Sequence, residues 1–222
     1  MLSHANLVAN VLQTEAWVRG AFAPGREVAL VPLPLYLLFA LTCPLTFMRL
    51  GATNVFATNV FVTNVLVTNR RDLPALIKEI THAKPSAING VNTLFRALLD
   101  TPGVAGAATG TLKLAVAGGM TMQRGVAERW QQRFGVHVTE GYGLTETSPI
   151  VCANRLDAGQ FTSAIGLPIP STEVAILTLG KPGEICVRGP QVMHGYGNNP
   201  DETAKVVYAR RLATHRRHRG HG

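Results

Sequence analysis

The chain has 222 residues, of which 46% are hydrophobic and 15% are charged, so it can bury a sizeable core as one or two domains and is not intrinsically disordered. The net charge of +8 would suit nucleic acid, but five of those charges are arginines after Tyr208, and the preceding residues carry only +3. No aromatic residue follows Tyr208 to stack on a base, which favours a solvated basic end over a nucleic-acid-binding arm.

The positions of the cysteines and histidines argue against a disulfide-rich protein and against a metal site. Cys43, Cys152 and Cys186 are far apart, so they indicate neither a disulfide framework nor a structural zinc site and fit a reducing cytoplasm. Three histidines in the last eight residues have no carboxylate or thiolate beside them, so we expect no metal site there. The first ten residues lack the basic start and apolar block of a cleavable signal.

The uncharged stretch 28–48 is long enough to span a bilayer, but Pro32, Pro34 and Pro44 interrupt it. It favours a buried strand, loop and helix over a membrane span. We expect a cytoplasmic protein with at most a peripheral association with the inner face of the membrane. The sequence gives no indication of oligomeric state.

Strand and helix patterns alternate along most of the chain, beginning with a helix that Ser3 can cap and that continues to about Trp17. The remaining predicted strands are 28–31, 60–67, 86–89, 112–116 and 136–140, and the remaining predicted helices are 38–50, 73–82, 91–99 and 123–134. This alternation predicts an α/β fold with a mainly parallel sheet and helices on its faces.

Beyond Pro149 the pattern changes to short strands separated by Gly and Pro. We therefore predict an α/β core over 1–150, for which the segment and the resemblance described below imply adenylate binding, a small β-rich subdomain over 151–207, and a basic, disordered tail over 208–222. Within the core, Thr-Asn-Val recurs every five residues from Thr53, and Thr-Asn recurs once more at Thr68. Because five matches neither the strand nor the helix period, the copies are interpreted as surplus repeats of one strand.

The segment Gly141-Tyr142-Gly143-Leu144-Thr145-Glu146 combines residue types that suit nucleotide binding. Its glycines would let the backbone approach a ligand, and Tyr142 offers an aromatic face for adenine. Thr145 supplies a hydroxyl for phosphate and Glu146 a carboxylate for Mg²⁺. The alternative for these six residues alone is an ordinary turn from a strand into a loop.

Several further blocks occur in the order found in the acyl-activating, AMP-forming superfamily, which the chain resembles, most closely its bacterial long-chain fatty acid:CoA ligases. They lie at Met1–Asn10, Pro32–Phe39, Thr68–Pro74, Gly90–Phe95, Ala117–Met120, Gly166–Pro170, Gly183–Pro190 and Gly195–Tyr196. The resemblance covers about residues 1–207. It implies the partial N-terminal domain of the adenylate-forming fold.

The resemblance also implies a two-step reaction with Mg²⁺ as cofactor and ATP and CoA as co-substrates, in which a fatty acid becomes an acyl-adenylate and then an acyl-CoA. Thr145 and Glu146 would be catalytic, with Glu146 binding Mg²⁺. The nucleotide would contact Gly118, Gly119, Met120, Gly141, Tyr142, Gly143, Leu144 and Thr145. Gly90 and Val91 would line the acyl tunnel, with plain core packing as the equal alternative.

Three departures from the family pattern limit this expectation. The Ser/Thr/Gly-rich phosphate loop that ends in Lys-Gly would directly precede Met1, and Leu37 stands where the fatty acid ligases have a histidine. After Val207 the chain contains no Thr-Gly-Asp segment and no adenylation lysine. We therefore expect a truncated ligase homologue that is weak or inactive alone. The alternative is a non-catalytic remnant that at most binds adenylate or acyl chains.

Overall fold

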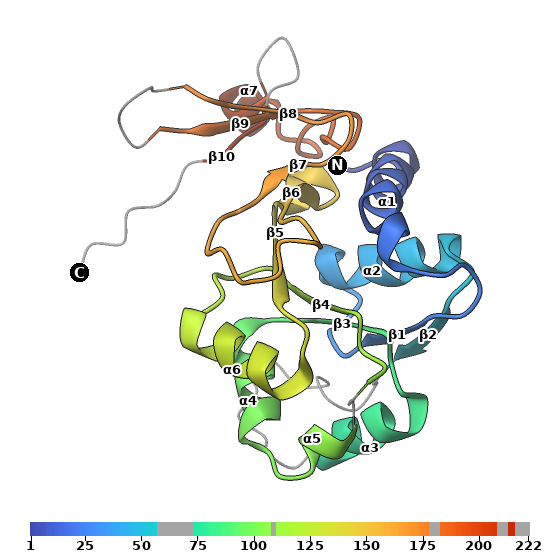
Figure 1. The fold of residues 1–222 in the computed structure, drawn as a ribbon. Helices are drawn as coiled ribbons and strands as arrows, with labels where there is room; N and C mark the ends of the chain where they lie inside the picture. The colour runs from blue at the N-terminus through green and yellow to red at the C-terminus, as the bar shows by residue number, and fades with distance from the viewer. Residues whose placement is uncertain (57–72, 108–109, 178–182, 208–212, 216–222) are drawn as a thin grey trace.

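The computed structural model describes residues 1–56, 73–107, 110–177, 183–207 and 213–215. Figure 1 shows a large sheet covered by helices on both faces, with a small sheet beside one end of it. The large sheet has the order β2-β1-β3-β4-β5-β6-β7. Its strands are β1 (Val28–Val31), β2 (Thr53–Phe56), β3 (Ala87–Gly90), β4 (Leu114–Ala117), β5 (Val138–Gly143), β6 (Ile150–Ala153) and β7 (Leu167–Pro168).

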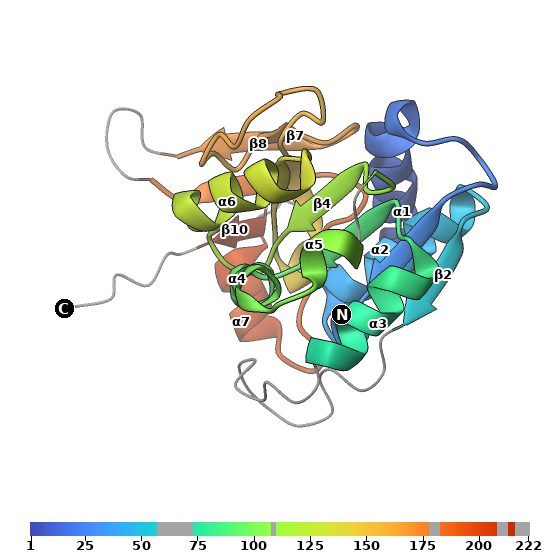
Figure 2. The ribbon, with the colours of Figure 1, turned by 60° about the horizontal axis from the view of Figure 1, so that its bottom comes forward.

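The pairings from β2 through β5 are parallel, and those of β5 with β6 and β6 with β7 are antiparallel. The helices of this region are α1 (His4–Val18), α2 (Leu38–Arg49), α3 (Leu73–Ala83), α4 (Asn92–Asp100), α5 (Val104–Ala107) and α6 (Arg124–Phe134). Short 3-10 turns occur at η1 (Arg19–Ala21) and η2 (Thr145–Thr147). In Figures 1 and 2, α1 and α2 lie on one side of the parallel strands, and α3 to α6 lie on the other.

Alternating residues of the central strands build a core on each face. Ile88 of β3 joins the cluster that contains Phe95 and Trp130, whose rings meet edge to face with centroids 4.7 Å apart. Ala87, one residue earlier, joins a second cluster with Phe47 of α2. The two-residue period of a strand thus directs successive side chains into the two helical layers.

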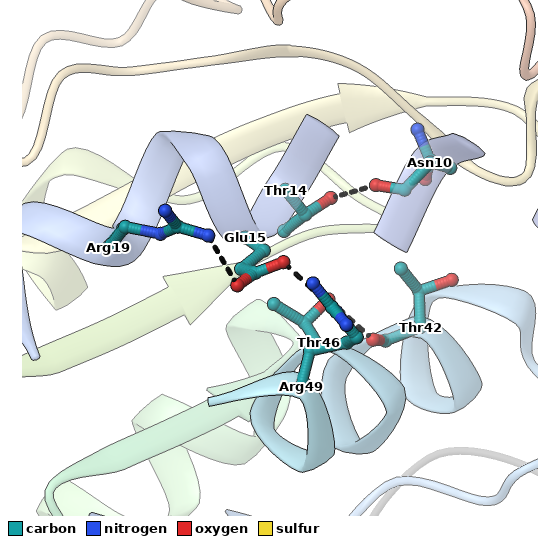
Figure 3. A network of polar contacts seen from close by, with 7 residues as sticks. All are labelled: Asn10, Thr14, Glu15, Arg19, Thr42, Thr46 and Arg49. Atoms are coloured by element: carbon teal, nitrogen blue, oxygen red, sulfur yellow. Dashed lines mark hydrogen bonds and ion pairs between the residues drawn. The ribbon is translucent and has the colours of Figure 1, made fainter. Parts of the chain in front are cut away.

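An ion pair network joins α1 to α2 (Figure 3). The Glu15 carboxylate is only 6% exposed, and it accepts hydrogen bonds from Arg19 at 2.8 Å and from Arg49 at 3.2 Å. These guanidinium groups, Arg19 foremost, hold the pKa of Glu15 below its usual value against the opposing effect of burial. The first helix is therefore fixed to the second by a partly buried charge cluster.

The small sheet has the order β10-β9-β8, is antiparallel, and consists of β8 (Glu173–Ile176), β9 (Ile185–Arg188) and β10 (Ala213–His215), with α7 (Pro200–Val206) beside it. Buried polar side chains of α1 reach the chain that follows β9. Asn6 donates to the carbonyl oxygens of Pro190 and Val192, and Gln13 donates to Gln191 at 3.1 Å. These bonds fix residues 190–192 against the first helix.

The predicted α/β class is confirmed, as are the helices that begin near His4, Leu38, Leu73, Asn92 and Arg124, with Ser3 as the N-cap of α1. The predicted strand 60–67 lies outside the described residues. The first copy of the repeat forms β2 at the sheet edge, which the sequence pattern did not predict. Residues 213–215, which lie within the predicted tail, form a short strand that pairs with β9.

Other differences concern boundaries. β6 and β7 follow the predicted domain boundary at residue 150 and belong to the large sheet, and the small sheet begins with β8. The division of the chain into domains stays a prediction. Pro32 and Pro34 lie in the loop between β1 and α2, whereas Pro44 lies within α2. Over the described residues, no helix combines the length and apolar character needed to cross a membrane.

Candidate active site

A cavity of about 230 Å³ lies between the sheet and the layer formed by α1 and α2. Its apolar part combines side chains of both helices, of β4 and of loops, namely Trp17, Val18, Leu33, Leu37, Leu38, Phe39, Val91, Leu114, Val116, Leu156 and Ile169. Its other wall is backbone-rich and consists of Gly118, Gly119 and residues 139–145. The cavity therefore reaches the carboxyl ends of β4 and β5, where open parallel sheets bind ligands.

The turn after β4 contributes Gly118 and Gly119, with Met120 next to them. A side chain at Gly118 would bring its Cβ within 3.0 Å of the Phe39 ring, so the absence of a side chain lets α2 approach the turn closely. Two side-chain oxygens hold the end of this turn. The Glu140 carboxylate accepts from the Met122 N–H at 3.1 Å, and the Asn92 amide oxygen accepts from the Gln123 N–H at 2.9 Å.

The two glycines of the Gly-Tyr-Gly segment differ in whether the surrounding chain requires glycine at their positions. A Cβ at Gly143 would lie 1.8 Å from the Pro149 carbonyl oxygen, so the approach of β6 requires glycine there. At Gly141 the nearest atom to an added Cβ is the Cys152 oxygen at 3.8 Å, an ordinary contact. The packing of the chain thus leaves Gly141 without a steric requirement of its own, whereas Gly143 is needed whether or not a ligand binds.

The η2 turn after β5 carries Thr145 and Glu146 and is fixed through Thr147. The Thr147 hydroxyl, 0% exposed, donates to the Pro149 carbonyl oxygen at 2.7 Å and accepts from the Leu144 N–H at 3.1 Å. Glu146 is half-buried, and its carboxylate accepts a hydrogen bond from the Tyr196 hydroxyl at 2.8 Å. Thr145 is exposed and lines the cavity.

The η2 turn offers one carboxylate, that of Glu146, as a ligand for Mg²⁺. No group of three or more His, Cys, Asp or Glu side chains that could hold a metal occurs among the described residues. Glu146 instead presents a single carboxylate, one residue after the exposed Thr145. Magnesium in nucleotide sites is held by one or two carboxylates together with substrate phosphates, so a single half-buried carboxylate on this turn is compatible with that mode.

The structure brings most of the predicted site residues to one cavity. Its lining includes Val91, Gly118, Gly119, Gly141, Tyr142, Gly143, Leu144 and Thr145. Three predicted residues lie outside that lining, namely Gly90, Met120 and Glu146. Gly90 faces the side chains of Leu94 and Phe95 in the opposite core layer.

Two kinds of lining residue were not predicted. Trp17 and Val18 come from the last turn of α1, and only the fold brings them to the sheet. Glu140 directly precedes Gly141, and burial raises the pKa of its carboxyl while the Met122 N–H partly offsets the rise. An acidic residue at the end of a buried strand is the one sequence signal that could have identified it.

Comparison with known proteins decides the family. A family model described as "AMP-binding enzyme" matches residues 1–197. The chain belongs to the AMP-binding enzyme family. The long-chain-fatty-acid–CoA ligase of Yersinia pestis is 43% identical over 222 residues, covering 96% of this chain and 38% of that relative. The enzyme of the same name from Escherichia coli O157:H7 is 43% identical over 215 residues, covering 93% of this chain and 36% of the relative.

Solved structures show the same fold for this AMP-binding enzyme family member. ATP-bound MatB from Rhodopseudomonas palustris superposes with a TM-score of 0.77 at 24% identity, over 96% of this chain and 41% of MatB. An ATP-bound RpMatB-BxBclM chimera reaches a TM-score of 0.79 at 24% identity, over 96% of this chain and 41% of the chimera. The chain thus spans less than half the length of the relatives and structures that it matches.

Proposed function

We propose that this chain carries the adenylate- and acyl-binding site of a long-chain fatty acid:CoA ligase. The observation that supports it best is the composition of the cavity between the sheet and the α1–α2 layer. An apolar compartment formed by residues such as Trp17 and Phe39 is continuous with the glycine-lined wall at Gly118 and Tyr142. An acyl-adenylate has the same two parts, an apolar chain and a nucleotide. The 43% identity to long-chain-fatty-acid–CoA ligases supports this choice of acyl group.

In the proposed reaction, a fatty carboxylate oxygen attacks the α-phosphorus of ATP, and pyrophosphate leaves. The CoA thiolate then attacks the acyl carbon, and AMP leaves. Tyr142 stacks against adenine, Gly118, Gly119 and Met120 lie along the nucleoside, and the Thr145 hydroxyl donates to phosphate. Glu146 would hold Mg²⁺, which supplies positive charge near the phosphates when bound. Val91 lies at the acyl side of the cavity.

The acyl side is tested with non-hydrolysable acyl-sulfamoyl adenosines of increasing chain length. Each methylene that enters the apolar compartment should contribute up to about 0.8 kcal/mol, so the hexadecanoyl compound should bind far more tightly than the acetyl compound. Val91→Thr adds a hydroxyl to the cavity at nearly constant volume and should reduce that difference. Val136→Thr, half-buried outside the cavity, is the matched control. Equal affinities for both chain lengths would contradict the assignment of the acyl site.

Residues 1–222 do not contain every motif that the family resemblance assigns to catalysis. They contain no Lys-Gly pair and no Thr-Gly-Asp segment, the motifs that the family resemblance assigns to triphosphate and ribose binding. We infer that the 222-residue chain, assayed by itself, binds adenylate without rapid turnover. Incubation with ATP, Mg²⁺ and palmitate should release little pyrophosphate. Release at the rate of an intact ligase would overturn this inference and leave the binding site unaffected.

A further inference from the structure

Glu146 contacts a residue far away in the sequence. Tyr196, fifty residues later, donates its hydroxyl to Glu146 Oε1 at 2.8 Å. Glu146 Oε2 accepts no hydrogen bond from any of the described residues. One carboxylate oxygen is thus engaged and the other is available, and the structure gives this arrangement no role in the core.

The backbone around Tyr196 is held at a fixed place. Its N–H donates to the Thr203 hydroxyl of α7 at 2.9 Å. The preceding Gly195 has φ +147°, and a Cβ there would come within 2.5 Å of Thr203 Cγ2. Only glycine allows this approach between the 195–196 segment and α7. The ring therefore reaches Glu146 from an anchored segment.

The backbone of Glu146 is anchored to the same segment. The Met193 N–H donates to the Glu146 carbonyl oxygen at 2.8 Å, and Thr147 fixes the rest of the turn through Leu144 and Pro149. Rotation of the Glu146 side chain is the freedom that these backbone bonds leave. The Tyr196 hydroxyl restricts that rotation.

We propose that Tyr196 is the positioning residue of Glu146, holding one carboxylate oxygen so that the other is presented to a Mg²⁺ ion that enters with the nucleotide phosphates. This rests on the proposed function, because it presumes that the turn faces phosphate. Residues that orient a metal ligand through a hydrogen bond typically change metal affinity by about 10–100-fold when removed. A phenol that donates to a half-buried carboxylate suits this role because it fixes the direction of the ligand without adding charge.

The test measures how strongly Mg²⁺ tightens nucleotide binding. Affinity for the α,β-methylene analogue of ATP is determined by calorimetry with and without saturating Mg²⁺, and affinity for AMP is determined without metal. Tyr196→Phe removes only the hydroxyl and should lower the Mg²⁺-dependent gain by about tenfold, with AMP affinity unchanged. Glu146→Gln should abolish the gain, and adding Tyr196→Phe to it should change nothing more.

Two further variants keep the test interpretable. Tyr36→Phe also removes one phenolic hydroxyl, from a side chain that is 78% exposed and does not line the cavity, and it should behave like wild type. Thr203→Val removes the anchor of the Tyr196 backbone and should reduce the Mg²⁺ gain even if Tyr196→Phe fails to fold.

The outcomes separate the two proposals. A full Mg²⁺ gain in Tyr196→Phe, or an equal loss of metal-free AMP affinity, overturns the role of Tyr196 and leaves the adenylate site in place. The same holds if wild type binds AMP but gains nothing from Mg²⁺. A wild-type chain that binds no AMP overturns the proposed function and this inference with it.

Discussion

Glu140 offers the sharpest contrast between two substitutions at one position. Its carboxylate accepts from the Met122 N–H at 3.1 Å, and Met122 is 3% exposed, so water cannot readily replace the acceptor. Glu140→Ala should leave that N–H unsatisfied, which costs about 1–3 kcal/mol. A loss of about 2 kcal/mol in a chain of this length lowers Tm by roughly 4–8 °C. Glu140→Gln retains an acceptor oxygen and should avoid this loss.

The charge of Glu140 adds a pH dependence. Burial raises the pKa of the folded carboxyl, and the Met122 N–H opposes that rise only in part. A carboxyl with a raised folded pKa costs stability when ionised, and that cost is absent below the unfolded pKa of about 4.3. The cost appears as pH rises above that value. Glu140→Gln should therefore be more stable than wild type at pH 7, and the difference should shrink as pH falls toward 4.

Thermal and denaturant unfolding from pH 4 to 7 measures both effects. Glu128→Gln, on the exposed side of α6, is the control, because among the described residues Glu128 forms only an exposed ion pair with Arg124 at 3.6 Å. AMP affinity should fall in Glu140→Ala, since the turn that contains Gly118 loses one of its anchors. The reasoning is refuted if the Ala and Gln variants lose equal stability, or if Gln is less stable than wild type at pH 7.

Three further variants test the surroundings of the site. Glu15→Gln should lower the free energy of unfolding by about 1 kcal/mol at pH 7. The effect is small because the side chains of Arg19 and Arg49 are both over half exposed, so solvent screens their charges. The depressed pKa of Glu15 means that this contribution vanishes as pH falls through its folded pKa, so a constant difference in denaturant midpoint would contradict it. Thr147→Val should lower the free energy of unfolding by about 1 kcal/mol, because the buried hydroxyl no longer donates to the Pro149 carbonyl oxygen, while the Leu144 N–H keeps that oxygen as its acceptor. An unchanged denaturant midpoint would contradict this. Gly118→Ala should lower the free energy of unfolding by about 1–3 kcal/mol, because the added methyl group presses on the Phe39 ring. Adding Phe39→Leu to Gly118→Ala should relieve this overlap, so strictly additive effects of the two substitutions would contradict the contact.

The sequence predicted much of the α/β core because its local signals agree with the fold. The Ser3 cap and the spacing of apolar residues predicted α1, and the buried strand at 28–31 ends before Pro32 as expected. β2 was missed because its residues belong to a repeat whose period fits neither element. The Gly-Tyr-Gly segment predicted the place of the cavity, but not that Gly143 is required by the Pro149 carbonyl.

Long-range contacts account for what the sequence could not predict. Trp17 reaches the cavity only because α1 packs beside α2, and Tyr196 reaches Glu146 only because residues 190–196 lie against the η2 turn. Neither contact has a periodic or local signature. Glu140 looks like an ordinary strand end until the Met122 N–H is placed beside it.

Calorimetric titration of AMP into the wild-type chain, Tyr142→Ala and Tyr36→Ala tests the central claim most directly. Tyr142 lines the cavity, whereas the exposed Tyr36 does not. An aromatic face on a nucleobase contributes about 1–3 kcal/mol, so Tyr142→Ala should weaken AMP binding by roughly 5- to 150-fold while Tyr36→Ala leaves it unchanged. Absence of AMP binding by the wild-type chain, or equal affinity in all three proteins, would contradict an adenylate site at this cavity.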